Sequence, residues 1–343
     1  MESGTRVKVP RPFSGGLLLS YKCSAACRHC MYGCSPTWPG DWIAEADLER
    51  GLAQLAGKIQ PSQGGAKAVS LNYGLHFTGG EPFLNFELLL RAVRIAEELK
   101  IPSTFVETNS SWCTNEQITR ERLTQLKASG LKGILISVNP FYAEFIPFER
   151  SERCIQISGE VFGRNVMVYQ LEFYHLFRRL GIKKQISEAD SLKIMETEYH
   201  SAHVEFFMMG RAVTRLRDSH PAYRASVFFR QPCRPEFLRS WHNHFDNYGN
   251  LLPGYCGGIS LGNWFQLESL MEEGIDLGAH PILSFLVAED MEGLFNFAKG
   301  LGYEESERGY VSKCDLCLEL RRHLLSRKDF RELAPREFYK NVE

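Results

Sequence analysis

The sequence has no run of about 18 uninterrupted apolar residues, the length that a membrane-spanning helix requires. Residues 1–12 carry charges and prolines and lack the apolar core of a secretory signal. The formal net charge is only −1, so neither a basic surface for nucleic acid nor the acidic excess of a disordered chain is expected. These absences predict a globular protein of 343 residues that binds neither membrane nor nucleic acid.

Cysteine, in contrast, is plentiful, with ten residues in the chain. Disulfides are typical of secreted proteins, and this chain shows no secretion signal. Five of the cysteines fall into the spacings C-x3-C-x2-C and C-x2-C, which suit ligation of a metal or cluster. We therefore expect reduced cysteines and a cytoplasmic location.

Short apolar runs alternate with helical patterns over the first two thirds of the chain. We predict strands at 15–20, 69–77, 103–107, 133–138 and 202–208, and helices at 45–59, 85–99, 114–129 and 166–180. This alternation predicts an α/β fold with a parallel sheet and crossover helices, in an open or partial barrel. After residue 209 the periodicity fades, and from 265 onward the chain is largely helical. The predicted domains are 1–215 and 216–343.

The most informative segment is a cysteine triplet directly after the first predicted strand. Cys23, Cys27 and Cys30 have the spacing C-x3-C-x2-C. Three thiolates can hold three irons of a [4Fe–4S] cluster and leave the fourth iron open, whereas a structural zinc site normally uses four protein ligands. A zinc knuckle with Cys34 or His29 as the fourth ligand is the alternative. The triplet resembles the signature of the radical S-adenosylmethionine (radical SAM) superfamily.

That resemblance implies a partial (β/α)6 barrel of the TIM type, in which the open iron binds the amino and carboxylate groups of SAM. It implies that the reduced cluster cleaves SAM to methionine and a 5′-deoxyadenosyl radical, which takes a hydrogen atom from the substrate. By the same resemblance the cluster cysteines are catalytic, and a flavodoxin or ferredoxin supplies the electron.

A second motif follows the second predicted strand, where parallel β/α folds place their ligands. Gly79 and Gly80 allow close backbone approach, Glu81 offers an acceptor for an ammonium group, and Pro82 comes next. Alone, this segment also reads as a turn with proline at the first position of a helix. It resembles the Gly-Gly-Glu-Pro motif of the superfamily, which implies contact with the methionyl amine of SAM.

The next two strand ends also carry polar residues. Thr108 and Asn109 resemble the Thr-Asn-Gly region of the superfamily near the SAM methionine, with Ser110 in place of the glycine. Ser137 and Asn139 resemble a Ser-x-Asp segment that meets the SAM ribose or carboxylate, with asparagine in place of the acid. The alternative for Ser137 and Asn139 is that they only end a strand and begin a turn.

The C-terminal part holds a second set of cysteines: Cys233, Cys256, Cys314 and Cys317. Four cysteines can close a [4Fe–4S] cluster, and a four-cysteine zinc site fits the same residues. The stretch from Asp246 to Cys256 resembles the auxiliary-cluster extensions called SPASM and twitch, although six residues separate Gly249 from Cys256 and the longer SPASM cysteine run is missing. The resemblance implies a small C-terminal domain with an auxiliary [4Fe–4S] cluster. His242 and His244 beside it are expected to be hairpin residues, with a substrate-facing acid/base role as the alternative.

Together these motifs predict a radical SAM enzyme that modifies a small molecule or peptide. By the resemblance, an auxiliary cluster beside the substrate favours net oxidation or bond formation, of oxidoreductase type. The alternatives are a radical rearrangement, elimination or epimerisation in natural-product biosynthesis, and, from another class, a non-catalytic metal-binding scaffold.

Overall fold

The computed structural model describes residues 6–199, 207–233 and 237–343. The chain divides into two compact units. The first, here called the sheet unit, consists of Phe13–Cys27 and Cys34–Phe206. The second unit consists of Met1–Pro12, Arg28–Gly33 and Phe207–Glu343. Each unit is described by itself.

The sheet unit is built on five parallel strands in the order β6-β5-β4-β3-β2. Their bounds are β2 (Ser14–Leu18), β3 (Gly74–Thr78), β4 (Phe105–Thr108), β5 (Gly133–Ser137) and β6 (Val166–Tyr169). Each strand pairs with the next one along the chain, which requires a crossover between them. Among the described residues the sheet ends at β6, so it is open. The predicted α/β fold with an open parallel sheet is confirmed.

The two faces of this sheet differ in polarity because side chains alternate along each strand. One face is mainly apolar, with Thr108 at its carboxyl edge. Its buried apolar residues are Leu17, Leu75, Phe77, Val106, Ile134 and Ile136. This face suits the apolar stripes of the crossover helices. The other face, here called the inner face, carries the polar residues His76, Thr78, Glu107, Ser137 and Tyr169.

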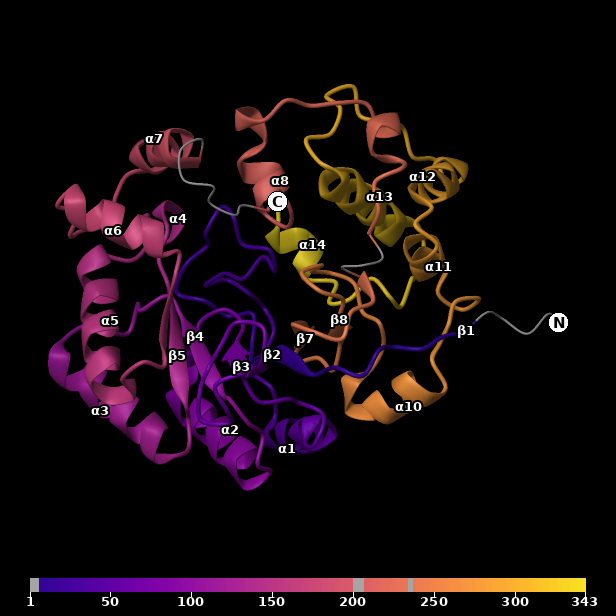
Figure 1. The fold of residues 1–343 in the computed structure, drawn as a ribbon. Coiled ribbons are helices and arrows are strands. Elements are labelled where there is room, and N and C mark those ends of the chain that lie inside the picture. Colours follow the sequence, from indigo (N-terminus) through magenta and orange to yellow (C-terminus); the bar gives the residue numbers. More distant parts are fainter. Residues whose placement is uncertain (1–5, 200–206, 234–236) are drawn as a thin grey trace. The chain divides into compact units, whose positions relative to one another are not determined.

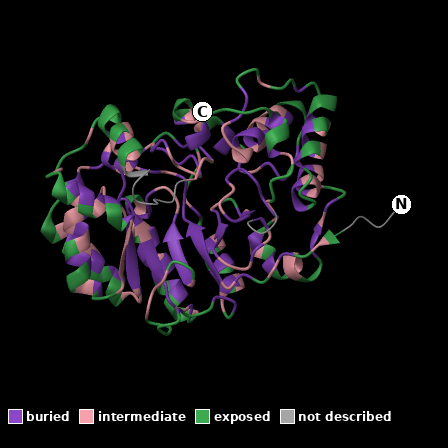
Figure 2. Ribbon diagram, turned by 45° about the horizontal axis from the view of Figure 1, so that its top comes forward, coloured by how far each residue is buried: buried purple, intermediate pink, exposed green. Residues whose placement is uncertain are grey.

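Seven helices of the sheet unit lie in the described residues (Figure 1): α1 (Glu45–Leu55), α2 (Phe86–Glu98), α3 (Glu116–Ala128), α4 (Pro140–Ala143), α5 (Phe148–Phe162), α6 (Leu171–Arg179) and α7 (Glu188–Tyr199). Asparagine caps three of them. Asn85 Oδ1 accepts from Leu88 N, Asn115 Oδ1 from Ile118 N and Asn139 Oδ1 from Tyr142 N. Figure 2 shows central strands of the sheet buried and helices that carry both buried and exposed residues. The described chain has no helix that is both long and apolar enough to cross a membrane.

Two predicted elements of the sheet unit need correction. The helix predicted at 166–180 is wrong over its first turn, because Val166–Tyr169 forms β6 and the helix begins at Leu171. The strand predicted at 69–77 occupies only Gly74–Thr78. The strand predicted at 202–208 lies largely outside the described residues, and its last two residues, 207 and 208, are not in a strand.

The second unit combines short strands with helices. Strands β1 (Arg6–Val7) and β9 (Ile275–Asp276) pair antiparallel, and β7 (Asn243–Phe245) and β8 (Leu251–Leu252) form a hairpin. The helices are α8 (Ala212–Arg215), α10 (Leu267–Glu272), α11 (Pro281–Val287), α12 (Met291–Gly300), α13 (Lys313–Arg327) and α14 (Phe338–Asn341). Fully buried leucines of α12 and α13 form part of its core: Leu294, Leu316, Leu320 and Leu324.

Candidate functional site

The carboxyl ends of β2 to β5 lead into the four polar segments that the sequence analysis selected. Parallel strands end at the same edge of a sheet, so these segments gather there. In the sheet unit this edge holds Cys23 and Cys27, while Cys30 belongs to the second unit. Cys23 and Cys27 are buried, with 8% and 5% of their surface exposed.

The loop after β3 lies directly against the loop that carries Cys23. Gly80 N donates to Ser20 O at 2.9 Å, and Glu81 N donates to Lys22 O at 3.0 Å. A Cβ on Gly80 would lie 1.9 Å from Lys22 O, and one on Gly79, where φ is 129°, would lie 2.2 Å from Ser20 O. Both positions therefore require glycine, as the close backbone approach in the motif predicts.

Glu81 is buried and accepts hydrogen bonds from the loop after β4. Its carboxylate accepts from Asn109 N at 2.8 Å and from Thr108 Oγ1 at 2.9 and 3.0 Å. Its Oε1 also accepts from Phe83 N at 3.2 Å. Burial raises the pKa of Glu81 to about 7, although these three donors lower it. Glu81 thus positions Thr108 and Asn109, a role that the sequence analysis did not predict. Pro82 is the first residue of the short 3-10 helix Pro82–Asn85 (η1).

Asn109 connects the β4 loop with the cysteine loop. Its Nδ2 donates to Cys23 Sγ at 3.6 Å and to Ser24 Oγ at 3.0 Å. The next residue, Ser110, has a φ of 66°, a left-handed conformation that glycine adopts most easily. The backbone here therefore has the shape that a Thr-Asn-Gly segment would favour, with serine in the glycine position.

Ser137 and Asn139 end β5 in the way that the alternative interpretation predicts. Asn139 Oδ1 accepts from Tyr142 N at 3.1 Å and so caps α4. Ser137 is half-buried and lies on the inner face opposite Tyr169. Contact of either residue with SAM stays a prediction.

The inner face adds residues that the sequence analysis did not select. Glu107 Oε2 accepts from Thr78 Oγ1 at 2.7 Å, and Glu107 Oε1 lies 3.5 Å from His76 Nε2. The side chain of His76 is 2% exposed and that of Glu107 is 24% exposed. The signal in the sequence is the alternation in β3, where His76 and Thr78 are polar and Leu75 and Phe77 are apolar.

In the second unit, the Cys30 segment is held by Gly210 and Arg211. Arg211 N donates to Cys30 O at 3.0 Å, and its Nη2 donates to Gly33 O at 2.7 Å. A Cβ on Gly210 would lie 2.6 Å from Cys30 O. Burial, with Arg211 and Arg28, lowers the pKa of His29 to about 3, so this ring is neutral. The Gly-Arg pair thus fixes the third cysteine of the triplet.

The second set of cysteines gathers within the second unit. Cys314 and Cys317 lie in the first turns of α13, which Ser312 caps by accepting from Asp315 N at 3.1 Å. Burial is the main cause that raises the pKa of Cys314 to about 12, and the thiols of Cys317 and Cys233 add to it. Burial is also the main cause that raises the pKa of Cys256, and the thiols of Cys233 and Cys314 add to it. These mutual electrostatic effects indicate that the four thiols lie near one another. That they bind a cluster or a metal stays a prediction.

Cys256 follows the β7–β8 hairpin, which is built around a buried aspartate. Asp246 Oδ1 accepts from Tyr248 N at 3.0 Å and from Asn250 N at 2.8 Å, and Gly249 has a φ of 88°. The adjacent His244 is buried, and its Nδ1 lies 2.9 Å from Tyr32 Oη. His242 and His244 are hairpin residues, as expected.

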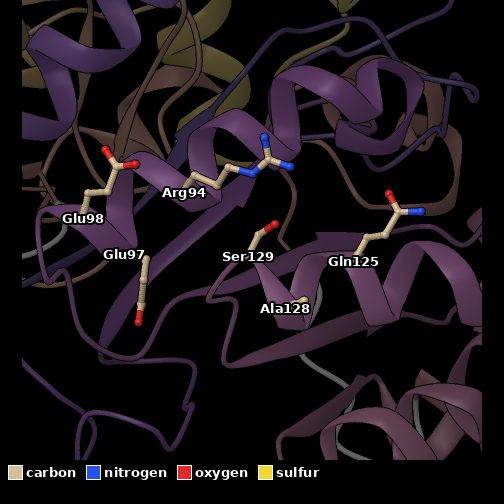
Figure 3. Close-up of a pocket in the computed structure, with 6 residues that line it drawn as sticks. All are labelled: Arg94, Glu97, Glu98, Gln125, Ala128 and Ser129. Carbon is tan, nitrogen blue, oxygen red and sulfur yellow. The ribbon is translucent and has the colours of Figure 1, made fainter.

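A shallow pocket of about 490 Å³ lies elsewhere in the sheet unit (Figure 3). Its lining residues are on the last turns of α2 and α3, or just beyond: Arg94, Glu97, Glu98, Gln125, Ala128 and Ser129. Crossover helices run antiparallel to their strands, so these helix ends lie at the amino ends of the strands. The pocket is thus on the opposite edge from the predicted site.

No protein-family model and no curated protein matches this chain. The solved structures that are similar include BtrN in complex with AdoMet and 2-DOIA, at 14% identity and a TM-score of 0.48, with 84% of this chain and 91% of that chain covered. Native anSMEcpe with bound AdoMet and Cp18Cys peptide is 13% identical, with a TM-score of 0.43 and coverage of 92% and 98%. SuiB of Streptococcus suis bound to S-adenosylmethionine is 18% identical, with a TM-score of 0.42 and coverage of 89% and 75%. All three scores are below 0.5, so the functional argument rests on the residues of this chain.

Proposed function

We propose that this protein is a radical SAM enzyme that reductively cleaves S-adenosylmethionine and abstracts hydrogen from a small-molecule or peptide substrate. The observation that carries the proposal is the contact of the Gly79-Gly80-Glu81 loop with the cysteine loop through Gly80. This contact brings the glycine motif next to the cysteine loop at the carboxyl edge of the sheet, and cleavage of SAM requires both motifs. A flavodoxin or ferredoxin is the proposed electron donor.

The residues present fit a cluster at the first site. Cysteine thiolates are the ligands that iron–sulfur clusters use, and three of them leave one iron open. Asn109 Nδ2 points a donor at Cys23 Sγ, as hydrogen bonds to cluster sulfurs do. When bound, the cluster and SAM would together supply one electron and a 5′-deoxyadenosyl radical.

The chain's own residues would bind and orient the reactants. The backbone of Gly79 and Gly80 borders the cysteine loop and would meet the methionyl end of SAM. Glu81 holds Thr108 and Asn109 in place beside it. We propose that the polar groups of the inner face, Glu107 among them, contact the substrate. The burial of Cys23, Cys27 and Glu81 would limit the access of water, which would protect a reactive radical.

We further propose that the second set of cysteines binds an auxiliary [4Fe–4S] cluster in a domain formed by residues 216–343, beside a barrel domain at 1–215. The electrostatic effects of these thiols on one another support one shared site. Four thiolates can hold a [4Fe–4S] cluster, and a four-cysteine zinc site is the alternative.

An auxiliary cluster suits net oxidation or bond formation, in which the substrate radical loses one electron. A rearrangement, elimination or epimerisation would use the same first site with the second cluster as a structural element. A non-catalytic scaffold would need a closed four-ligand site at the triplet and no SAM binding.

The test is iron and sulfide counting with electron paramagnetic resonance on four forms of the reconstituted chain. Cys27→Ser should lose the signal that SAM perturbs and keep the second cluster, and Cys256→Ser should do the reverse. Cys154→Ser, on α5 beside Ser158, is the matched control and should keep both. A wild-type chain that loads iron but shows no SAM-perturbed signal would contradict the proposal.

A further inference from the structure

A buried arginine lies beside the second set of cysteines. Arg321 is 6% exposed and is on α13, as are Cys314 and Cys317. Positions three, four and seven residues apart share one face of a helix, so the three side chains are on the same side of α13. The helix therefore presents two thiols and one fixed positive charge together.

The guanidinium group connects two of the cysteine segments. Its Nε donates to Cys317 O at 3.3 Å, and its Nη1 donates to Gly257 O at 3.0 Å, directly after Cys256. Nη1 also donates to Tyr339 Oη at 3.2 Å. These bonds fix the charge relative to the thiols, so its electrostatic effect does not depend on a mobile side chain.

Among the described residues, the acidic side chains nearest the guanidinium are the thiols of Cys256 and Cys317 and the phenol of Tyr339. Burial raises the pKa of Tyr339 to about 12, so that group is neutral. In the described chain no aspartate or glutamate forms an ion pair with Arg321. A buried charge without a counter-charge is costly, so this arginine implies an anion at the thiol cluster.

We propose that Arg321 sets the reduction potential of the auxiliary cluster and makes it a better electron acceptor. A [4Fe–4S] cluster with four thiolates is anionic, and its one-electron reduction adds negative charge. A fixed positive charge beside it stabilises the reduced form more than the oxidised form, which raises the potential. The inference rests on the proposed function, because it requires the second cysteines to bind a cluster. With a higher potential, the auxiliary cluster would accept an electron from the substrate radical more readily.

The test is an EPR-monitored redox titration of the second cluster in the full chain, with Cys27→Ser removing the first cluster from every form. Arg321→Gln should lower the midpoint potential at unchanged iron content, and Arg321→Lys, which keeps the charge, should lower it less. Arg322→Gln is the matched control on the same helix and should change the potential less than Arg321→Gln, since position 322 is off the face that carries Cys314, Cys317 and Arg321.

A midpoint potential of Arg321→Gln equal to that of the parent, with the cluster fully loaded, would overturn the proposal. If Arg321→Gln does not load iron, Arg321→Met replaces it, and the same fall in potential is expected. Failure of both variants to hold the cluster while Arg321→Lys holds it would also overturn the proposal, because Arg321 would then serve assembly alone. A parent protein without a second cluster would instead contradict the proposed function.

Discussion

Replacement of Gly80 by alanine tests the packing of the two central loops. The added Cβ would lie 1.9 Å from Lys22 O, 2.3 Å from Lys22 C and 2.8 Å from Cys23 N. All three atoms are backbone, so no side-chain rotation can relieve the overlap. The loop after β3 must therefore move away from the cysteine loop.

The magnitude follows from the bonds that this movement breaks. Gly80 N to Ser20 O and Glu81 N to Lys22 O are the two hydrogen bonds between the loops. Each contributes about 1 kcal/mol net, and a buried partner left unsatisfied costs about 1–3 kcal/mol. We expect Gly80→Ala to lower the free energy of unfolding by about 2–4 kcal/mol and to reduce iron loading at the first site.

Urea unfolding of the iron-free chain measures the first effect, and iron counting after reconstitution measures the second. Gly159→Ala in α5 is the control, because a Cβ there meets nothing within 4 Å and the backbone is helical. It should raise the unfolding free energy by about 0.5–1 kcal/mol through the lower entropy cost of alanine in a helix. Equal stability and equal iron content in the two variants would refute the reasoning.

Three further changes have expected outcomes. Asn109→Leu removes the N–H donor to Cys23 Sγ. Hydrogen bonds to cluster ligands favour the reduced form, so this change should lower the midpoint potential of the first cluster in an EPR titration. An unchanged potential would argue against that contact. Burial raises the pKa of Glu81 from 4.5 to about 7, so the folded chain holds more protons than the unfolded chain between these pH values. The unfolding free energy should therefore fall by up to about 3 kcal/mol as pH rises through this window, and urea unfolding of Glu81→Gln should show a smaller fall. The buried carboxylate of Asp315 is 6% exposed and lies 2.6 Å from the guanidinium of Arg217. Arg217→Met removes this ion-pair partner and should lower the free energy of unfolding, measured in urea, by about 3–5 kcal/mol. Adding Asp315→Asn should recover part of that loss, and no recovery would exclude the ion pair as the cause.

The strand ends could be located from the sequence because local signals mark them. The strands Gly74–Thr78 and Phe105–Thr108 contain both apolar and polar residues, and the motif residues Gly79-Gly80-Glu81 and Thr108-Asn109 stand at their carboxyl ends. The helix predicted at 85–99 is observed as Phe86–Glu98, since its apolar spacing and its asparagine cap agree. These features depend on neighbours along the chain, which a sequence displays directly.

The helix predicted at 166–180 is wrong over residues 166–169 for a physical reason. Val166–Tyr169 is a short apolar run, which suits a buried strand and a helix equally well. Its pairing with β5 decides the outcome, and that pairing is a tertiary effect. A run of four residues gives too little periodicity to distinguish the two.

The supporting residues of the sites could not be predicted because their partners are far away in the sequence. Arg211 binds the backbone of Cys30 and Gly33 from almost 180 residues away. Arg321 reaches Gly257 across 64 residues. Motif spacing identifies the cysteines, but the charges and donors around them are brought there only by the fold.

The measurement that tests the central claim most directly is the detection of 5′-deoxyadenosine. The wild-type chain is reconstituted without oxygen, its iron is counted, and dithionite and S-adenosylmethionine are added. We predict about eight irons per chain, four for each of two [4Fe–4S] clusters, together with 5′-deoxyadenosine. A chain that carries its full iron and forms no 5′-deoxyadenosine would contradict the assignment as a radical SAM enzyme.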